Sequence, residues 1–116
     1  MALEASARLI IRSGSGDLPG AFGAGCAELL RGVEREHSLN RAAKDMGMAY
    51  SKAWRLMKEA EAHLGTRLLD RDGARGSQLT AAGRLALQSY DQIQSEISDL
   101  AQARVEELLG GISEAL

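Results

Sequence analysis

The sequence has few of the residues that build disulfides, metal clusters or aromatic cores. Of its 116 residues, one is cysteine and one is proline, and aromatic residues make up 3%. A single cysteine can form no disulfide within the chain and supplies no cysteine-based zinc cluster, which indicates a reducing compartment. No apolar run is long enough to span a membrane, and Arg8 and Arg12 interrupt the early apolar residues where a signal peptide would lie. We therefore expect a cytoplasmic protein with a core of Leu, Ala, Ile and Met.

The length and the charge of the chain limit what it can do. There is room for one domain and one additional long helix. The net charge of −2 is unevenly distributed: residues 38–76 hold eight basic and five acidic residues, whereas residues 77–116 hold two and six. The middle of the chain is therefore the part suited to a polyanion.

Residues 38–65 have the pattern of two helices joined by a tight turn. The apolar positions at helical spacing are Leu39, Ala42, Ala43 and Met46 in the first helix, and Ala53, Trp54, Met57, Ala60 and Leu64 in the second. Ser38 and Ser51 are expected to cap the starts of these helices. Gly47 and Gly65 are expected to end them. This is the pattern of a helix-turn-helix, whose second helix enters the DNA major groove, although an ordinary helical hairpin has the same periodicity.

Polar side chains distinguish between these two alternatives. They lie near the start of the first helix and off the apolar face of the second: Asn40, Arg41, Lys44, Ser51, Lys52, Arg55 and Lys58. Such groups donate hydrogen bonds to phosphates and to the acceptor atoms of guanine. They favour DNA binding.

The segments before this unit read as a strand, a loop and a helix. Ala7–Arg12 is rich in Leu and Ile and predicts a strand. The glycine-rich loop that follows contains no lysine, so it is not a phosphate-binding loop of the usual kind. Ala21–Glu36 has helical periodicity, and Cys26 falls on its apolar face, which predicts a buried, unreactive thiol.

A short hairpin, or wing, is expected after the second helix of the pair. Arg67–Asp70 and Gln78–Thr80 read as its strands, and Asp72–Ser77 as its turn. Arg71 and Arg75 would then lie over the adjacent backbone or minor groove. A solvated hairpin without a nucleic-acid contact is the alternative.

From Thr80 onward the chain predicts one long helix that ends or weakens at Gly110–Gly111. Its apolar stripe consists of Leu79, Gly83, Leu87, Tyr90, Ile93, Ile97 and Leu100, continuing with a shift through Val105, Leu108, Leu109 and Ile112. Such a helix has more apolar length than a small domain can cover. We expect pairing with the same helix of a second subunit, so that residues 1–80 form the winged unit and residues 81–116 the dimerisation helix.

No group of residues predicts catalysis or metal binding. Glu59, Glu61, Asp70 and Asp72 are interleaved with basic residues and read as surface ion pairs. His37 and His63 have no metal-ligand spacing. Because we find neither a nucleophile–base pair nor a cofactor loop, we expect no enzyme activity and no cofactor.

The order of the motifs resembles a known family. FGAG at residues 22–25 precedes AAKDMGMAYSKAW (42–54), RLLDR (67–71) and LTAAGRLAL (79–87). Together they resemble the N-terminal winged helix-turn-helix domain of the molybdate-dependent regulator ModE, and more distantly the DNA-binding domains of LysR-type regulators. The resemblance covers residues 7–100.

The resemblance implies a mainly α fold with a small β wing, and a homodimer formed through the first and last helices on a two-fold symmetric operator. Tyr50, Ser51, Lys52 and Arg55 would face the groove, while Ala53 and Trp54 would pack on the preceding helix. The helical tail is too short for the small β-barrel that binds molybdate in that family. We therefore expect no molybdate-binding domain here.

These observations predict a dimeric, sequence-specific DNA-binding transcriptional regulator. Lys44, Lys58 and Arg75 would hold phosphates, and Ser51, Lys52 and Arg55 would read base edges. The alternative is a winged-helix interaction module that dimerises through its last helix without specific DNA binding.

Overall fold

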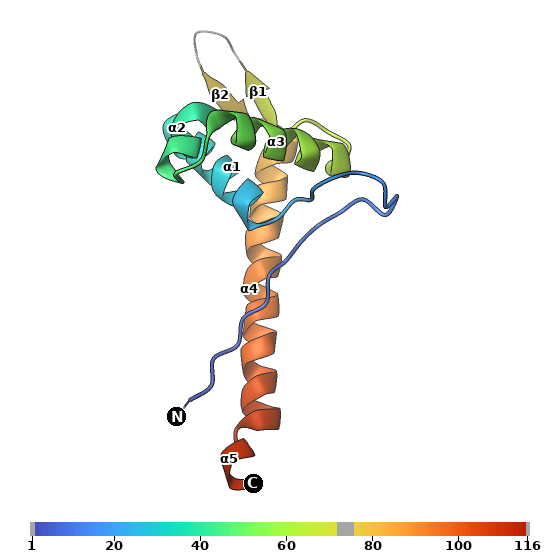
Figure 1. Cartoon of the computed structure of the whole chain (residues 1–116), viewed down its shortest axis with the longest axis vertical. Helices are drawn as coiled ribbons and strands as arrows, with labels where there is room; N and C mark the ends of the chain where they lie inside the picture. The colour runs from blue at the N-terminus through green and yellow to red at the C-terminus, as the bar shows by residue number, and fades with distance from the viewer. Residues whose placement is uncertain (1, 72–75, 116) are drawn as a thin grey trace.

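A small helical head sits at one end of a long helix. The computed structural model describes residues 2–71 and 76–115, and its extents are 62 × 32 × 24 Å. The helices are α1 (Ala24–Glu36), α2 (Leu39–Asp45), α3 (Tyr50–Leu64), α4 (Ala81–Leu109) and α5 (Ile112–Ala115), and the strands are β1 (Leu69–Arg71) and β2 (Ser77–Leu79). Figure 1 shows α1, α2, α3 and the hairpin gathered at one end of α4. The predicted class, mainly α with a small β wing, is confirmed.

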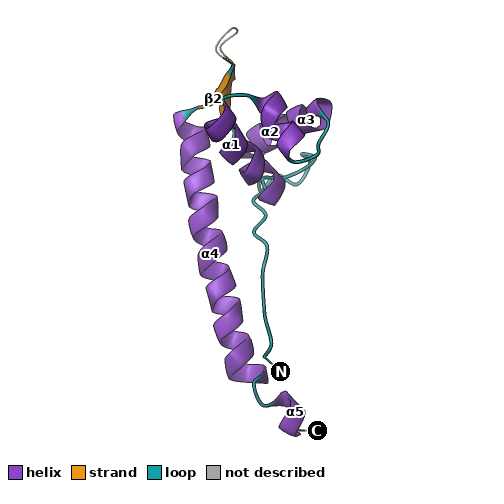
Figure 2. Cartoon of the chain, turned by 90° about the vertical axis from the view of Figure 1, so that its left-hand side faces the viewer, coloured by secondary structure: helices purple, strands orange, loops and turns teal. Residues whose placement is uncertain are grey.

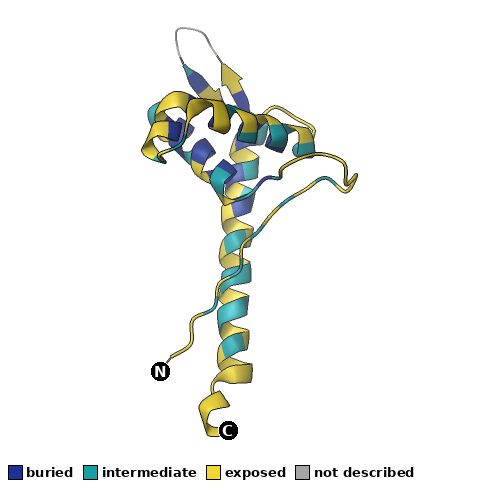
Figure 3. Cartoon of the chain, viewed as in Figure 1, coloured by how far each residue is buried: buried dark blue, intermediate teal, exposed yellow. Residues whose placement is uncertain are grey.

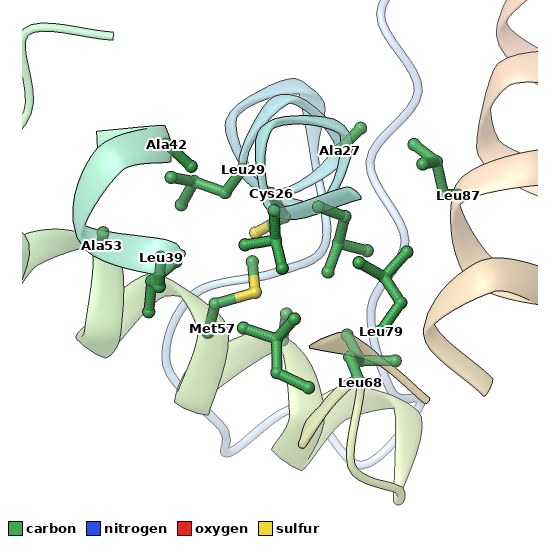
Figure 4. Close-up of a cluster of buried hydrophobic side chains, with 14 of the residues drawn as sticks. Cys26, Ala27, Leu29, Leu39, Ala42, Ala53, Met57, Leu68, Leu79 and Leu87 are labelled. Atoms are coloured by element: carbon green, nitrogen blue, oxygen red, sulfur yellow. The ribbon is translucent and has the colours of Figure 1, made fainter. Parts of the chain in front are cut away.

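The core of the head forms where α1, α2 and α3 meet (Figure 4). Its largest side chains with almost no exposed surface are Phe22, Leu29, Leu30, Val33, Leu39, Met57 and Leu68. Ala42 is buried against α1, where a Cβ added to Gly32 would lie 2.7 Å from the Cβ of Ala42. The close crossing of α1 and α2 therefore requires a glycine on one helix and a small residue on the other.

Three of the four predicted ends of the helix pair are confirmed. The hydroxyl of Ser38 accepts a hydrogen bond from the backbone N–H of Arg41 at 3.1 Å, and Gly47 and Gly65 are left-handed with φ of 66° and 71°. The predicted cap at Ser51 is wrong, because α3 begins two residues earlier than such a cap implies, at Tyr50, and its N-cap is Ala49, whose side chain makes no capping bond. Ser51 is instead an exposed residue of the first turn.

The wing is an antiparallel pair that starts later than predicted on its first strand. Leu69 pairs with Leu79 and Arg71 with Ser77. Arg67 lies outside the ladder because its carbonyl accepts from the hydroxyl of Thr80 at 2.7 Å. Most of the expected turn, residues 72–75, lies outside the described residues.

The strand predicted at Ala7–Arg12 is wrong. The segment is extended, but only Ile11 pairs with another backbone segment, in a single bridge to Phe22. Farther toward the N-terminus, side-chain amides of α4 occupy the backbone groups that a neighbouring strand would otherwise bind. The residues have strand propensity, but within the described part of the chain no second strand lies beside them.

Helix α4 begins as predicted, and its burial decreases along its length. Thr80 caps it by accepting from the N–H of Gly83 at 2.9 Å, and Gly110 follows its last residue. Its buried residues are Gly83, Leu87 and Tyr90, all in the first three turns. Figure 3 shows mixed intermediate and exposed residues along the rest. Within the described residues, no helix combines the length and the apolarity needed to cross a membrane.

The single cysteine is buried, as the sequence predicts. Cys26 is 3% exposed, and its Sγ lies 3.8 Å from the carbonyl oxygen of Leu56 on α3. Burial raises the pKa of this thiol above its ordinary value of 9.0. Because the thiolate is the reactive form, this environment makes Cys26 a packing residue.

Candidate nucleic-acid interface

The exposed side of α3 carries half of the predicted contact residues. Tyr50, Ser51, Lys52, Arg55 and Lys58 are all exposed on this helix. They stand on the side away from Ala53, Met57 and Ala60, which are buried in the core. The helix therefore presents a polar face outward while its apolar face fixes it to the head.

The contact residues predicted on α2 are exposed as well. Asn40, Arg41 and Lys44 lie on the solvent side of α2, opposite the buried Leu39 and Ala43. A hollow of about 500 Å³ brings Asn40 and Tyr50 to one place; its remaining lining residues are Ser38, Leu39, Gly76 and Ser77. The starts of α2 and α3 and the base of the wing thus share one concave surface.

Arg71 joins the wing to α3. Its guanidinium lies 3.7 Å from the centroid of the Trp54 ring and 5.7 Å from that of Tyr50, and it donates to the hydroxyl of Tyr50. Lys58 lies over the same indole at 4.4 Å. These cation–π contacts hold cationic groups against the outer part of α3. Arg75, the other arginine predicted on the wing, lies outside the described residues.

The expectation that Trp54 belongs to the core needs correction. Its side chain packs against the core but is only partly buried. Ala53, one residue before, is fully buried, as predicted. The indole of Trp54 stays partly exposed because its face binds cations, and the side chains of Arg71 and Lys58 both reach it. The spacing of Trp54 and Lys58, one helical turn apart, was the signal in the sequence.

Glu61 is a structural residue that the sequence analysis treated only as an ion-pair partner. Its Oε2 accepts from the backbone N–H of Leu68 at 2.8 Å and of Leu69 at 3.4 Å. Its Oε1 lies 3.4 Å from the Nζ of Lys58. Since the side chain is only 12% exposed, these bonds attach the start of the wing to the last turns of α3.

The other carboxylates form ion pairs, as predicted where the structure describes them. Glu59 lies 3.8 Å from Arg55, and Asp70 lies 3.6 Å from Arg67. Asp72 lies outside the described residues. Within residues 2–71 and 76–115, no three His, Cys, Asp or Glu side chains gather as a metal site.

His63 makes two backbone contacts near the end of α3. Its Nδ1 accepts from the N–H of Ser13 at 2.9 Å, and its Nε2 donates to the carbonyl of Pro19 at 2.9 Å. This pattern corresponds to a neutral imidazole with the proton on Nε2. His63 thereby fastens the glycine-rich loop to α3. The backbone of His37, the residue after the last one of α1, is in the left-handed region with φ of 56°.

Comparison with known proteins gives one family. Residues 27–84, half of the chain, match the model described as "Bacterial regulatory helix-turn-helix protein, lysR family". No curated protein matches the sequence. The matched range begins three residues into α1 and includes the rest of α1, α2, α3 and both strands of the wing, so it covers the predicted helix-turn-helix and wing.

Solved structures agree with this match. The DNA-binding domain of CbnR, crystallised with DNA, is 29% identical over 71% of this chain and 92% of that chain, with a TM-score of 0.57. CbnR, a LysR family transcriptional regulator, is 30% identical over 70% of this chain with a TM-score of 0.56, but the match spans only 27% of CbnR. The LysR-type resemblance is therefore supported, whereas the nearer resemblance to ModE stays a hypothesis.

Proposed function

This chain belongs to the lysR family of bacterial regulatory helix-turn-helix proteins, and on that premise we propose that it is a sequence-specific transcriptional regulator that binds DNA as a homodimer. The observation that carries the proposal is the match over 92% of a DNA-binding domain solved with DNA. The proposed division follows the sequence: residues 1–80 bind DNA and residues 81–116 dimerise. A location in the cytoplasm, where bacterial DNA lies, is part of the proposal.

We propose that α3 enters the major groove. Ser51, Lys52 and Arg55 are exposed on its outer side, and their donors fit the acceptor atoms on base edges. Tyr50 stands at the start of the helix with Arg71 on its hydroxyl. Because Arg55 interacts with Glu59 only at 3.8 Å, its guanidinium can turn to a base at small cost.

The surrounding basic residues would bind the phosphate backbone. Arg41 and Lys44 are exposed on α2 and Lys58 on α3, and Asn40 lines the hollow at the start of α3. Arg71, and by its place in the sequence Arg75, would contact the backbone or minor groove from the wing. Phosphate contacts of this kind make affinity fall steeply with salt.

The dimer would form through α1 and α4. Ile93, Leu100 and Leu108 are exposed large hydrophobic residues on α4, and burying them against a second copy would remove apolar surface from water. Two such subunits would contact half-sites about one helical turn apart. No contact with molybdate is proposed.

The test is selection from a random DNA pool at two salt concentrations. Recovery of a palindromic motif at both would support the regulator. Binding that is indifferent to sequence and disappears at the higher salt would leave only a nonspecific role. A stable dimer without binding at either salt would support the alternative, an interaction module.

A further inference from the structure

The N-terminal segment lies along α4, antiparallel to it. We call residues 2–12 the strap. The chain begins near the far end of α4 and runs back toward the head (Figures 1 and 2). At the near end of this path, the hydroxyl of Tyr90 donates to the carbonyl of Leu9 at 3.1 Å. This bond attaches the strap to the last buried residue of α4.

Two glutamines of α4 bind the backbone of the strap with both atoms of their side-chain amides. Gln94 accepts from the N–H of Leu9 at 2.9 Å and donates to the carbonyl of Ala7 at 2.5 Å. Gln102 accepts from the N–H of Ala5 at 2.7 Å and donates to the carbonyl of Leu3 at 3.0 Å. Each amide thus engages the strap as the C=O and N–H of one residue on an adjacent strand would.

The spacing of these glutamines fits the strap. Eight residues separate them on α4, which is about 12 Å at the rise of a helix. Their partners on the strap, Ala7 and Leu3, are four residues apart, about 13 Å in an extended chain. Neighbours one turn along support both amides, since Gln94 also donates to Ser98 at 2.9 Å and Gln102 to Glu106 at 2.9 Å.

The other end of the strap is anchored in the head. Ile11 and Phe22 exchange two backbone hydrogen bonds of 2.8 and 2.9 Å, and Phe22 is fully buried. The loop that follows is fastened to α3 by the two contacts of His63. The strap and its loop therefore run from the last turn of α3 to the far half of α4.

From this path we infer that the strap is a tie between the recognition helix and the dimerisation helix, and that Gln94 and Gln102 are positioning residues that set the half-site spacing accepted by the dimer. The inference rests on the proposed function. The last buried residue of α4 is Tyr90, and the helix continues to Leu109. A tilt of roughly 10° at Tyr90 would move its far end by about 5 Å, which exceeds the ~3.4 Å step of one base pair.

The test compares two double variants of the full chain. Gln94→Ala with Gln102→Ala removes the four hydrogen bonds of these amides to the strap and leaves the bond from Tyr90 to Leu9, while Gln88→Ala with Gln92→Ala changes two exposed glutamines of the same helix. Amide hydrogen exchange at Ala5 and Leu9 reports the strap directly. We expect exchange at least about tenfold faster in the first variant and unchanged in the second.

The preferred half-site spacing is then measured by DNA binding, with pairs of half-sites whose separation changes in steps of one base pair. We expect the wild type and the Gln88/Gln92 variant to prefer one spacing about tenfold, and the Gln94/Gln102 variant to bind neighbouring spacings within about threefold. Its affinity for a single half-site should stay within about twofold of the wild type, which shows that the head is intact.

The outcomes separate this inference from the proposed function. If the strap amides exchange faster but the spacing preference is unchanged, or if exchange does not change at all, the inference is overturned and the regulator stands. If the wild type itself shows no preference for paired half-sites, the proposed dimeric regulator fails, and the spacing role with it.

Discussion

The two halves of α4 are held by different forces. From Gly83 to Tyr90 the helix is buried against the head, and the ring of Tyr90 meets that of Phe22 edge-on with centroids 5.6 Å apart. Beyond Tyr90 the strap contacts are hydrogen bonds, and Leu100 remains 62% exposed. The near half therefore stabilises the fold by burial, whereas the far half leaves apolar surface for a partner.

The largest expected effect is on the free energy of unfolding, which should depend on the near half of α4 and little on the far half. Leu87→Ala removes a buried side chain of the near half and should lower the free energy of unfolding by about 2–5 kcal/mol. Leu100→Ala, at a position 62% exposed in the far half of the helix, should change it by less than about 0.5 kcal/mol in the dilute monomer. Urea unfolding measures both, and similar losses would contradict the division.

The next effect concerns association. Leu100→Asp should weaken the proposed dimer by about a hundredfold, roughly 2.7 kcal/mol, because it brings a charge to an apolar contact. Ser95→Asp adds the same charge at an exposed polar position and should have little effect. Sedimentation equilibrium measures the dimer. Equal dimer affinity in both variants would exclude the far half of α4 as the interface.

A change in the head should affect DNA binding even where dimerisation plays no part. Arg55→Ala should cost about 1–3 kcal/mol and relax specificity at one base position, for a single half-site as well as for a pair. Lys44→Ala should instead weaken binding to all sequences and reduce the salt slope by about one. Titrations against a set of single-base operator variants distinguish the two. A uniform loss with Arg55→Ala would make Arg55 a phosphate contact.

The smallest effect is a pH dependence at the buried thiol. Since burial raises the pKa of Cys26 in the folded chain, the unfolded chain loses its proton first as pH rises. The contribution is fully present below the unfolded pKa and is lost as pH climbs toward the folded pKa. As pH rises above the unfolded pKa, the free energy of unfolding should fall more steeply in the wild type than in Cys26→Ala, which urea unfolding at a series of alkaline pH values measures. Parallel pH profiles would contradict this.

Local signals in the sequence predicted much of the head. Ser38, Gly47 and Gly65 end helices because each position has a specific backbone requirement that few residue types meet. The outward side of α3 followed from periodicity, although the individual DNA contacts remain predictions.

The strap could not be predicted in the same way. Its partners, Gln94 and Gln102, lie between 85 and 99 residues away along the chain, and no periodic pattern connects them to it. A run of Leu and Ile indicates an extended backbone but not what will bind it. The partial exposure of Trp54 has a related cause, since its cationic neighbour Arg71 comes from the wing, and only the contact with Lys58, one helical turn away, has a signal in the sequence.

The glutamine contacts also determine how the strap can change in evolution. Gln94 and Gln102 bind only main-chain groups, which nearly every residue type provides. The side chains of the strap can therefore drift while its path is kept. Proline is the exception, because it has no N–H to donate at Ala5 or Leu9. In an alignment of relatives that keep the two glutamines, the residues of the strap would vary. The absence of proline at the positions of Ala5 and Leu9 would be the one sequence sign that the strap is kept.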